Sequence, residues 1–182
     1  MMKLSVLFLG MLRLSCGFMI EVCPPRSKVI DYPRSYAIDV GCGEGASTRM
    51  LQRKFPDSVA VGIDINRKII EKAVQGTGFF VHGDAGKENF PNDFFDVAQI
   101  KYSMLDIVNK VEVVDQLYRV MKKDSILFLA DYDEDHPILD AHPLRRFYDP
   151  YENLKLMNYY FTQQGIIYKN QMIYSVFYKP PE

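Results

Sequence analysis

Short apolar runs recur along residues 36–130, and stretches with helical spacing of apolar residues separate them. Each run is nearly continuous rather than alternating, which is typical of strands covered by helices on both faces of a sheet. The runs predict five strands, at residues 36–40, 58–63, 79–82, 94–100 and 125–130.

Between these runs, apolar residues return every three or four positions, the period of a helix face. One helix is predicted over residues 47–55, and a second runs from an N-cap at Asn66 to Val74. Strands that alternate with helices predict an α/β fold, with a doubly wound, mostly parallel sheet and helices on both faces. The inward face of a third helix is expected to carry Val111, Val114, Leu117 and Met121.

The last fifty residues change character and are rich in aromatic side chains. Apolar residues at helical spacing predict a helix over residues 151–164, which Gly165 would end as a C′ glycine. Residues 166–168 and 172–178 are β-branched and aromatic, and they predict a C-terminal antiparallel hairpin that closes the sheet.

Residues 1–33 form a separate N-terminal segment, with an apolar run interrupted at Arg13 and prolines further on. Three interpretations stay open: a cap helix ahead of the first strand, a targeting segment with Lys3 before an apolar core, or a membrane anchor. The run is too short to span a bilayer, so no stable membrane insertion is expected. Residues 34–182 would then form the ligand-binding domain.

Composition narrows the possible partners and the location. The net charge of −1 and the pI of about 6.3 do not favour a nucleic-acid partner. Cys16, Cys23 and Cys42 are too few for a disulfide framework and lack the spacing of a metal site. We therefore expect reduced thiols, a cytoplasmic location and no bound metal.

A glycine-rich stretch follows the first predicted strand and carries the clearest chemical signal. Gly41, Gly43 and Gly45 alternate with other residues, and a helical pattern begins directly after them. Glycine lets a ligand approach the backbone closely, and the start of the next helix directs free N–H groups into the loop. The order strand, glycine loop, helix predicts a nucleotide-binding site.

Four acids stand at or just after predicted strand ends: Asp39, Asp64, Asp84 and Asp131. Ligands of such sheets bind outside the carboxyl ends of the strands, so these acids predict a site at that edge. The glycine motif also fits a dinucleotide fingerprint, with Asp64 as the ribose ligand. However, Asp39 lies just before the glycines, where a carboxylate would repel a pyrophosphate and favour a cationic ligand.

Residues 36–131 resemble a class I S-adenosylmethionine-dependent methyltransferase of the broad small-molecule type. The resemblance rests on IDVGCGEG, VGIDIN, GDA, FDVAQIKYSMLDI and LYRVMKKDSILFLAD, which follow one another in the family's order. It implies a Rossmann-like methyltransferase fold that binds S-adenosylmethionine. The terminal hairpin is similar to the antiparallel last strands of that family.

The resemblance also implies roles for individual residues. Acids would hold the nucleoside, with Asp64 accepting hydrogen bonds from both ribose hydroxyls and Asp84 accepting one from the adenine amino group. Lys101 and Tyr102 would border the methionine end and the acceptor. The remaining expected contacts are Asp39, Gly41, Gly43 and Gly45 for the methionine part, Ile65 for the adenine face, and Ala85 beside Asp84.

A sulfonium is an activated methyl donor, so in-line alignment supplies much of the catalysis and a general base is optional. The expected reaction is methyl transfer to a small-molecule acceptor, with His136 as the best candidate base and Tyr102 facing the acceptor. Further candidates at the rim are Asp106, Asp131, Tyr132, Asp133 and His142. Three alternatives stay open: a non-catalytic cofactor-binding protein with a partner subunit, a protein methyltransferase, and an NAD-binding oxidoreductase.

Overall fold

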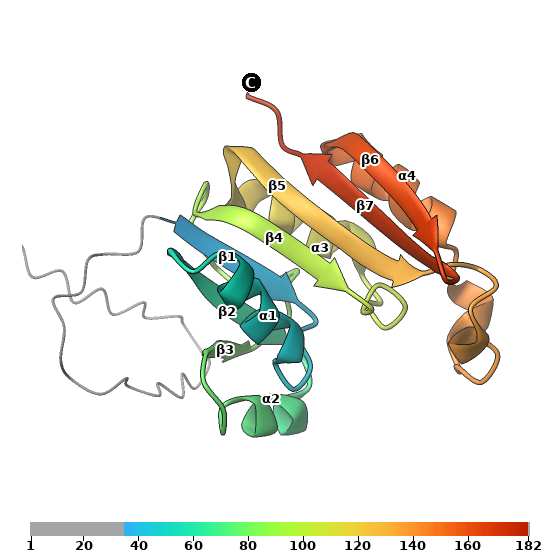
Figure 1. The fold of residues 1–182 in the computed structure, drawn as a ribbon, viewed down its shortest axis with the longest axis horizontal. Coiled ribbons are helices and arrows are strands. Elements are labelled where there is room, and N and C mark those ends of the chain that lie inside the picture. Colours follow the sequence, from blue (N-terminus) through green and yellow to red (C-terminus); the bar gives the residue numbers. More distant parts are fainter. Residues whose placement is uncertain (1–34, 182) are drawn as a thin grey trace, which may run out of the picture.

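The computed structural model describes residues 35–181, which form one seven-stranded sheet with helices on both faces (Figure 1). The strand order is β3-β2-β1-β4-β5-β7-β6. β7 is antiparallel to both β5 and β6, and the other neighbouring strands pair in parallel. The predicted α/β fold with a C-terminal antiparallel hairpin is therefore confirmed. The N-terminal segment predicted at residues 1–33 lies outside the described residues.

The elements follow the apolar runs of the sequence closely. The strands are β1 (Ser35–Val40), β2 (Ser58–Asp64), β3 (Phe79–His82), β4 (Phe95–Lys101), β5 (Met121–Tyr132), β6 (Thr162–Lys169) and β7 (Met172–Tyr178). The α-helices are α1 (Ala46–Lys54), α2 (Arg67–Ala73), α3 (Lys110–Val120) and α4 (Pro150–Tyr160), with short 3₁₀ turns at Pro137–Leu139 and Arg145–Phe147. None of the helices in the described part of the chain is long and apolar enough to cross a membrane.

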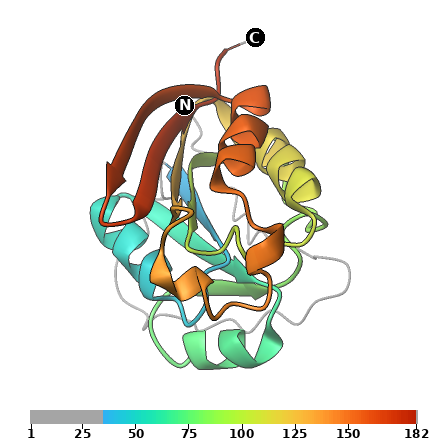
Figure 2. The same cartoon turned by 90° about the vertical axis from the view of Figure 1, so that its right-hand side faces the viewer.

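Helices occupy both faces of the sheet. α1 packs over β1 and β2 on one face, while α3 and α4 lie side by side on the other (Figure 2). The larger core lies beneath α3 and α4 and is centred on fully buried residues such as Phe95, Leu127 and Met157. The carboxyl ends of the parallel strands lie at one edge of the sheet. Of the four predicted acids, Asp64 and Asp84 are half-buried there, whereas Asp39 and Asp131 are buried.

The helix predicted over residues 151–164 is wrong at its C-terminal end. Asp149 caps α4 by accepting hydrogen bonds from the first-turn amides, and the helix ends at Tyr160. Thr162 already pairs with β7, and Gly165 lies inside β6 at a register shift. The glycine thus accommodates an irregularity in a strand and does not end a helix, because pairing with β7 outweighs the local helical pattern.

The expected inward face of the third helix is also displaced. Val111 is 60% exposed, and Met121 belongs to β5. The buried residues of α3 are Val113, Val114, Leu117 and Val120. β5 begins earlier than predicted because Met121 already pairs with Phe95 of β4. Nζ of Lys122 also lies 2.8 Å from the carboxylate of Asp96 on β4.

Candidate functional site

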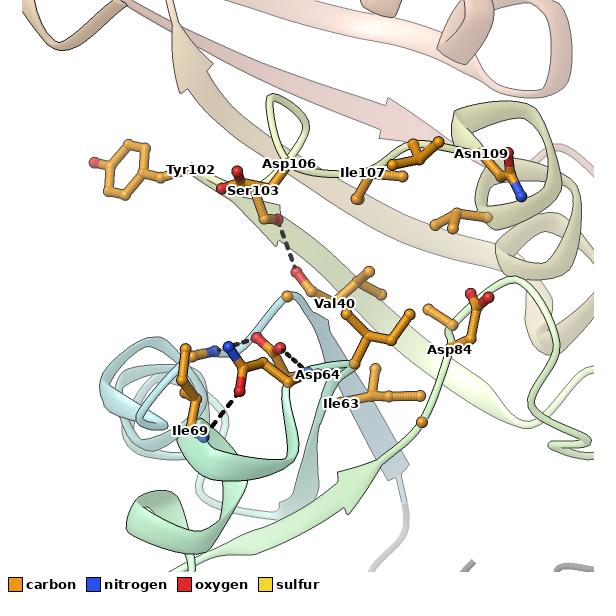
Figure 3. Close-up of a pocket in the computed structure, with 18 residues that line it drawn as sticks. Val40, Ile63, Asp64, Ile69, Asp84, Tyr102, Ser103, Asp106, Ile107 and Asn109 are labelled. Carbon is orange, nitrogen blue, oxygen red and sulfur yellow. Dashed lines mark hydrogen bonds between the residues drawn. The ribbon is translucent and has the colours of Figure 1, made fainter. Parts of the chain in front are cut away.

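A cavity of about 670 Å³ opens at the carboxyl ends of β1, β2 and β4. One wall is the loop that follows β4, and the opposite wall is the end of β2 and the start of α2 (Figure 3). Its volume lies within the range of small-ligand and cofactor pockets. Its position is the one predicted from the acids at the strand ends.

The glycine loop forms the floor of this cavity. The amides of Gly41 and Cys42 both donate to the carbonyl of Ile63, which fixes the loop to the end of β2. Gly41 has a φ of 70°, and a Cβ there would lie 2.4 Å from the Cβ of Ser103. Only glycine therefore lets the loop approach the β4 wall so closely. Gly41 and Gly43 line the cavity as predicted from the pattern.

Asp39 lies beneath this floor rather than on its surface. The side chain is fully buried and accepts hydrogen bonds from Ser47, Thr48 and Gln99 at 2.6–2.9 Å. Burial raises the pKa of this carboxyl, and the three hydrogen bonds oppose that rise. Asp39 is not among the cavity-lining residues, so it acts on the site by joining β1, α1 and β4.

Asp64 occupies the β2 wall. Its Oδ2 accepts a hydrogen bond from the amide of Gly43 at 2.9 Å, and its Oδ1 accepts one from the amide of Asn66 at 2.8 Å. An ionised carboxylate has about four acceptor positions, so both oxygens retain capacity for a ligand. The neighbouring Ile65 is 69% exposed and lines the mouth.

Asp84 and Ala85 line another part of the cavity, after β3. One carboxylate oxygen of Asp84 accepts from the amide of Gly86 at 3.0 Å, and the other lies 3.3 Å from Nζ of Lys87. The strand ends therefore bring Asp64 and Asp84 to one cavity, as the sequence predicts.

Besides Asp39, two more of the predicted cofactor contacts, Gly45 and Lys101, do not line the cavity. Gly45 is the N-cap of α1, and a Cβ there would lie 2.4 Å from the ring of Phe80. Nζ of Lys101 lies 5.1 Å from the ring centroid of Tyr102, in cation–π geometry. Gly45 thus allows α1 to begin close to Phe80, and Lys101 packs against the ring of Tyr102.

The two predicted catalytic residues are placed differently. Tyr102 lines the cavity with a φ of 58°, and its ring stacks on Tyr132 at a centroid distance of 5.6 Å. Burial raises the pKa of Tyr102 to about 12, so its hydroxyl is neutral near pH 7. His136 is not among the lining residues; its ring packs against Tyr132, and its Nδ1 accepts from the amide of Ile138.

Several lining residues were not singled out as ligand contacts from the sequence. They come mainly from the loop after β4 and the start of α3, that is, from the segment that follows the end of a strand. They include Ser103, Ile107, Val108, Asn109 and Val113, with Asn66 and Ile69 on the opposite wall. Asp106, a rim candidate from the sequence, also lines the cavity. Within residues 35–181 there is no group of three or more His, Cys, Asp or Glu side chains suited to a metal ion.

Comparison with known proteins places this architecture in a family. The sequence profile of a family described as "Methyltransferase domain" matches residues 34–174. The ubiquinone/menaquinone biosynthesis C-methyltransferase UbiE of Pseudomonas paraeruginosa is 29% identical over 151 residues, which cover 78% of this chain and 55% of the relative. The O-methyltransferase cnsE of Penicillium expansum is 30% identical over 64% of this chain and 45% of its own length.

The chain thus spans about half the length of these curated relatives. A crystal structure of a SAM-dependent methyltransferase from Methanosarcina mazei matches the fold with a TM-score of 0.65 and 18% identity. That match covers 83% of this chain and 95% of the other. The chain belongs to the methyltransferase-domain family, and its sheet has the class I, S-adenosylmethionine-dependent methyltransferase fold that the motifs predicted.

Proposed function

We propose that this chain transfers a methyl group from S-adenosylmethionine to a small organic acceptor. The observation that carries the proposal is the position of Asp64, whose carboxylate faces a cavity of about 670 Å³ beside the glycine loop. The family assignment favours a methyl donor over the nicotinamide dinucleotide that the glycine pattern alone left open.

The lining residues suit this methyl donor. Asp64 would accept from the ribose hydroxyls through the lone pairs that its two amide partners leave available. Ile65 would cover one face of the adenine, and Asp84 with Ala85 would contact its edge. Gly41 and Gly43 would then lie under the methionine part, where the absence of a Cβ allows close approach.

Residues behind the lining would support this arrangement. Asp39 would hold the glycine loop against α1 and β4, and Gly45 would let α1 begin against Phe80. Lys101 would position the ring of Tyr102 rather than contact the donor directly. S-adenosylmethionine supplies an activated methyl group, so the protein has mainly to align donor and acceptor.

The acceptor would approach along Tyr102, beside the loop after β4. Tyr102 and Tyr132 are stacked there, and Tyr102 is 38% exposed. Aromatic faces of this kind suit a planar organic acceptor. The names of two relatives, a quinone-biosynthesis C-methyltransferase and an O-methyltransferase, agree with this class of acceptor. A cytoplasmic location and a partner subunit remain predictions from the sequence.

The test is methyl transfer from radiolabelled S-adenosylmethionine to catechol and to 1,4-naphthoquinol, with and without the protein. The proposal predicts protein-dependent label in the organic extract, and Tyr102→Ala should reduce it. Saturable donor binding with no transfer to either probe would instead favour a non-catalytic subunit. A folded protein that binds no donor would refute the proposal.

A further inference from the structure

Asp106 lines the wall of the cavity and carries a carboxylate. Of the two catalytic residues predicted from the sequence, Tyr102 also lines the cavity and His136 does not. Asp106 belongs to the loop after β4, and its amide donates to the carbonyl of Ser103 at 3.0 Å. The hydroxyl of Ser103 donates in turn to the carbonyl of Val40, at the end of β1. The backbone of Asp106 is therefore linked through Ser103 to the end of β1, just before the glycine loop. Figure 3 shows Asp106 beside Ser103 and away from Asp84.

His142 faces the Asp106 carboxylate from a different part of the chain. Its Nε2 lies 3.3 Å from Oδ1 of Asp106, and its backbone bonds to Leu139 and Arg145 hold it in a turn. Nδ1 of His142 accepts a hydrogen bond from the amide of Leu144 at 3.2 Å. A nitrogen that accepts carries no proton, so in the neutral ring the proton lies on Nε2, the nitrogen 3.3 Å from the Asp106 carboxylate.

The arrangement divides the roles of the two residues. His142 has no free lone pair for the acceptor, because Nδ1 is engaged and Nε2 carries its proton. Asp106 has a carboxylate whose side chain is 66% exposed and whose Oδ2 has no hydrogen-bond donor among the described residues. The same reasoning applies to His136, whose Nδ1 accepts from Ile138 and whose ring is turned toward Tyr132.

Resting on the proposed function, we infer that Asp106 is the catalytic residue that binds the acceptor's proton, and that His142 is its positioning residue. This assigns the acceptor to the class that carries a removable proton, namely a phenolic or enolic hydroxyl or an amine. Asp106 takes the place that the sequence suggested for His136.

The step balances in atoms and charge. The bond between sulfur and the methyl carbon breaks as the bond from that carbon to the acceptor atom forms. The sulfur keeps the electron pair and becomes a neutral thioether, and the acceptor's proton passes to the Asp106 carboxylate. One positive and one negative charge are thus neutralised together. The exposure of Asp106 then allows the proton to leave to water.

The test uses two analogues and needs no acceptor. Sinefungin carries a cationic amine where S-adenosylmethionine carries the transferred methyl, whereas S-adenosylhomocysteine carries nothing there. Calorimetry would give the dissociation constant of each analogue for the wild type, Asp106→Asn and Asp140→Asn. Asp140 is an exposed acid of the neighbouring turn and serves as the matched control.

We expect Asp106→Asn to weaken sinefungin by about tenfold or more, because a charge-assisted hydrogen bond is lost. Binding of S-adenosylhomocysteine should change by less than about twofold, and Asp140→Asn should change neither. His142→Leu should weaken sinefungin by a smaller factor, and His142→Gln, which retains an N–H donor, should restore it.

The outcomes separate the inference from the function on which it rests. If Asp106→Asn binds both analogues as the wild type does, the assignment of Asp106 is overturned and the methyltransferase proposal stands. If His142→Leu leaves sinefungin binding unchanged, the positioning role is overturned. If the folded wild type binds neither analogue, the proposed function itself fails.

Discussion

Replacing Asp131 with Asn should change how the stability of this protein depends on pH. Asp131 lies at the end of β5, is 2% exposed, and accepts a hydrogen bond from the amide of Tyr132. Its Oδ2 has no hydrogen-bond partner among the described residues. Burial raises the pKa of Asp131 from 3.8 to about 7. Tyr148 and Lys110 favour the charged form and so oppose this rise, whereas the negative charge of Asp106 adds to it.

The sign follows from proton binding. Between the ordinary pKa and the raised one, the folded protein holds a proton on Asp131 that the unfolded chain has lost. The free energy of unfolding of the wild type therefore falls as the pH rises through this window. From about pH 5 to about pH 8 the loss from this one group is about 2–3 kcal/mol.

The assay is urea unfolding of the wild type, Asp131→Asn and Asp140→Asn at these two pH values. Asp131→Asn should gain about 2–3 kcal/mol relative to the wild type on going from the lower pH to the higher. Any constant cost of the buried amide cancels in that difference. Equal pH dependence in the wild type and Asp131→Asn would refute the argument, and Asp140→Asn should follow the wild type.

Two further substitutions test the stability of the fold and the geometry of the glycine loop. Lys179 is 5% exposed, and its Nζ donates hydrogen bonds to the carbonyls of Tyr118 and Met121 at 2.6 Å each. Lys179→Met removes both bonds and should lower the free energy of unfolding, measured by urea unfolding, by about 2–4 kcal/mol. Unchanged stability would contradict that role. Gly41→Ala should push the glycine loop away from Ser103. The affinity for S-adenosylmethionine, measured by calorimetry, should then fall at least about tenfold. An affinity equal to that of the wild type would show that the loop accommodates a side chain.

Much of the fold could be predicted because its local signals agree with one another. Continuous apolar runs indicated the parallel strands, and acids just past them indicated the ligand edge. Asp64 and Asp84 reach the cavity because parallel strands bring their carboxyl ends together. The glycine pattern predicted the floor of the cavity for a local steric reason: a Cβ at Gly41 would clash with Ser103.

What could not be predicted depends on contacts between distant parts of the chain. Asp39 is buried because Gln99 of β4 and two hydroxyls of α1 converge on it, which its position before the glycines does not reveal. Gly165 lies in a strand because β7 pairs with its neighbours. His142 meets Asp106 only because the turns after β5 come back over the loop after β4.

The central claim is that this cavity holds S-adenosylmethionine through Asp64. Its most direct test is calorimetric titration of S-adenosylmethionine into the wild type, Asp64→Ala and Asp57→Ala, whose side chain is exposed and remote from the cavity. The account predicts saturable binding that Asp64→Ala weakens by about 1–3 kcal/mol and Asp57→Ala leaves unchanged. Binding that Asp64→Ala does not alter, or no binding by folded wild-type protein, would contradict it.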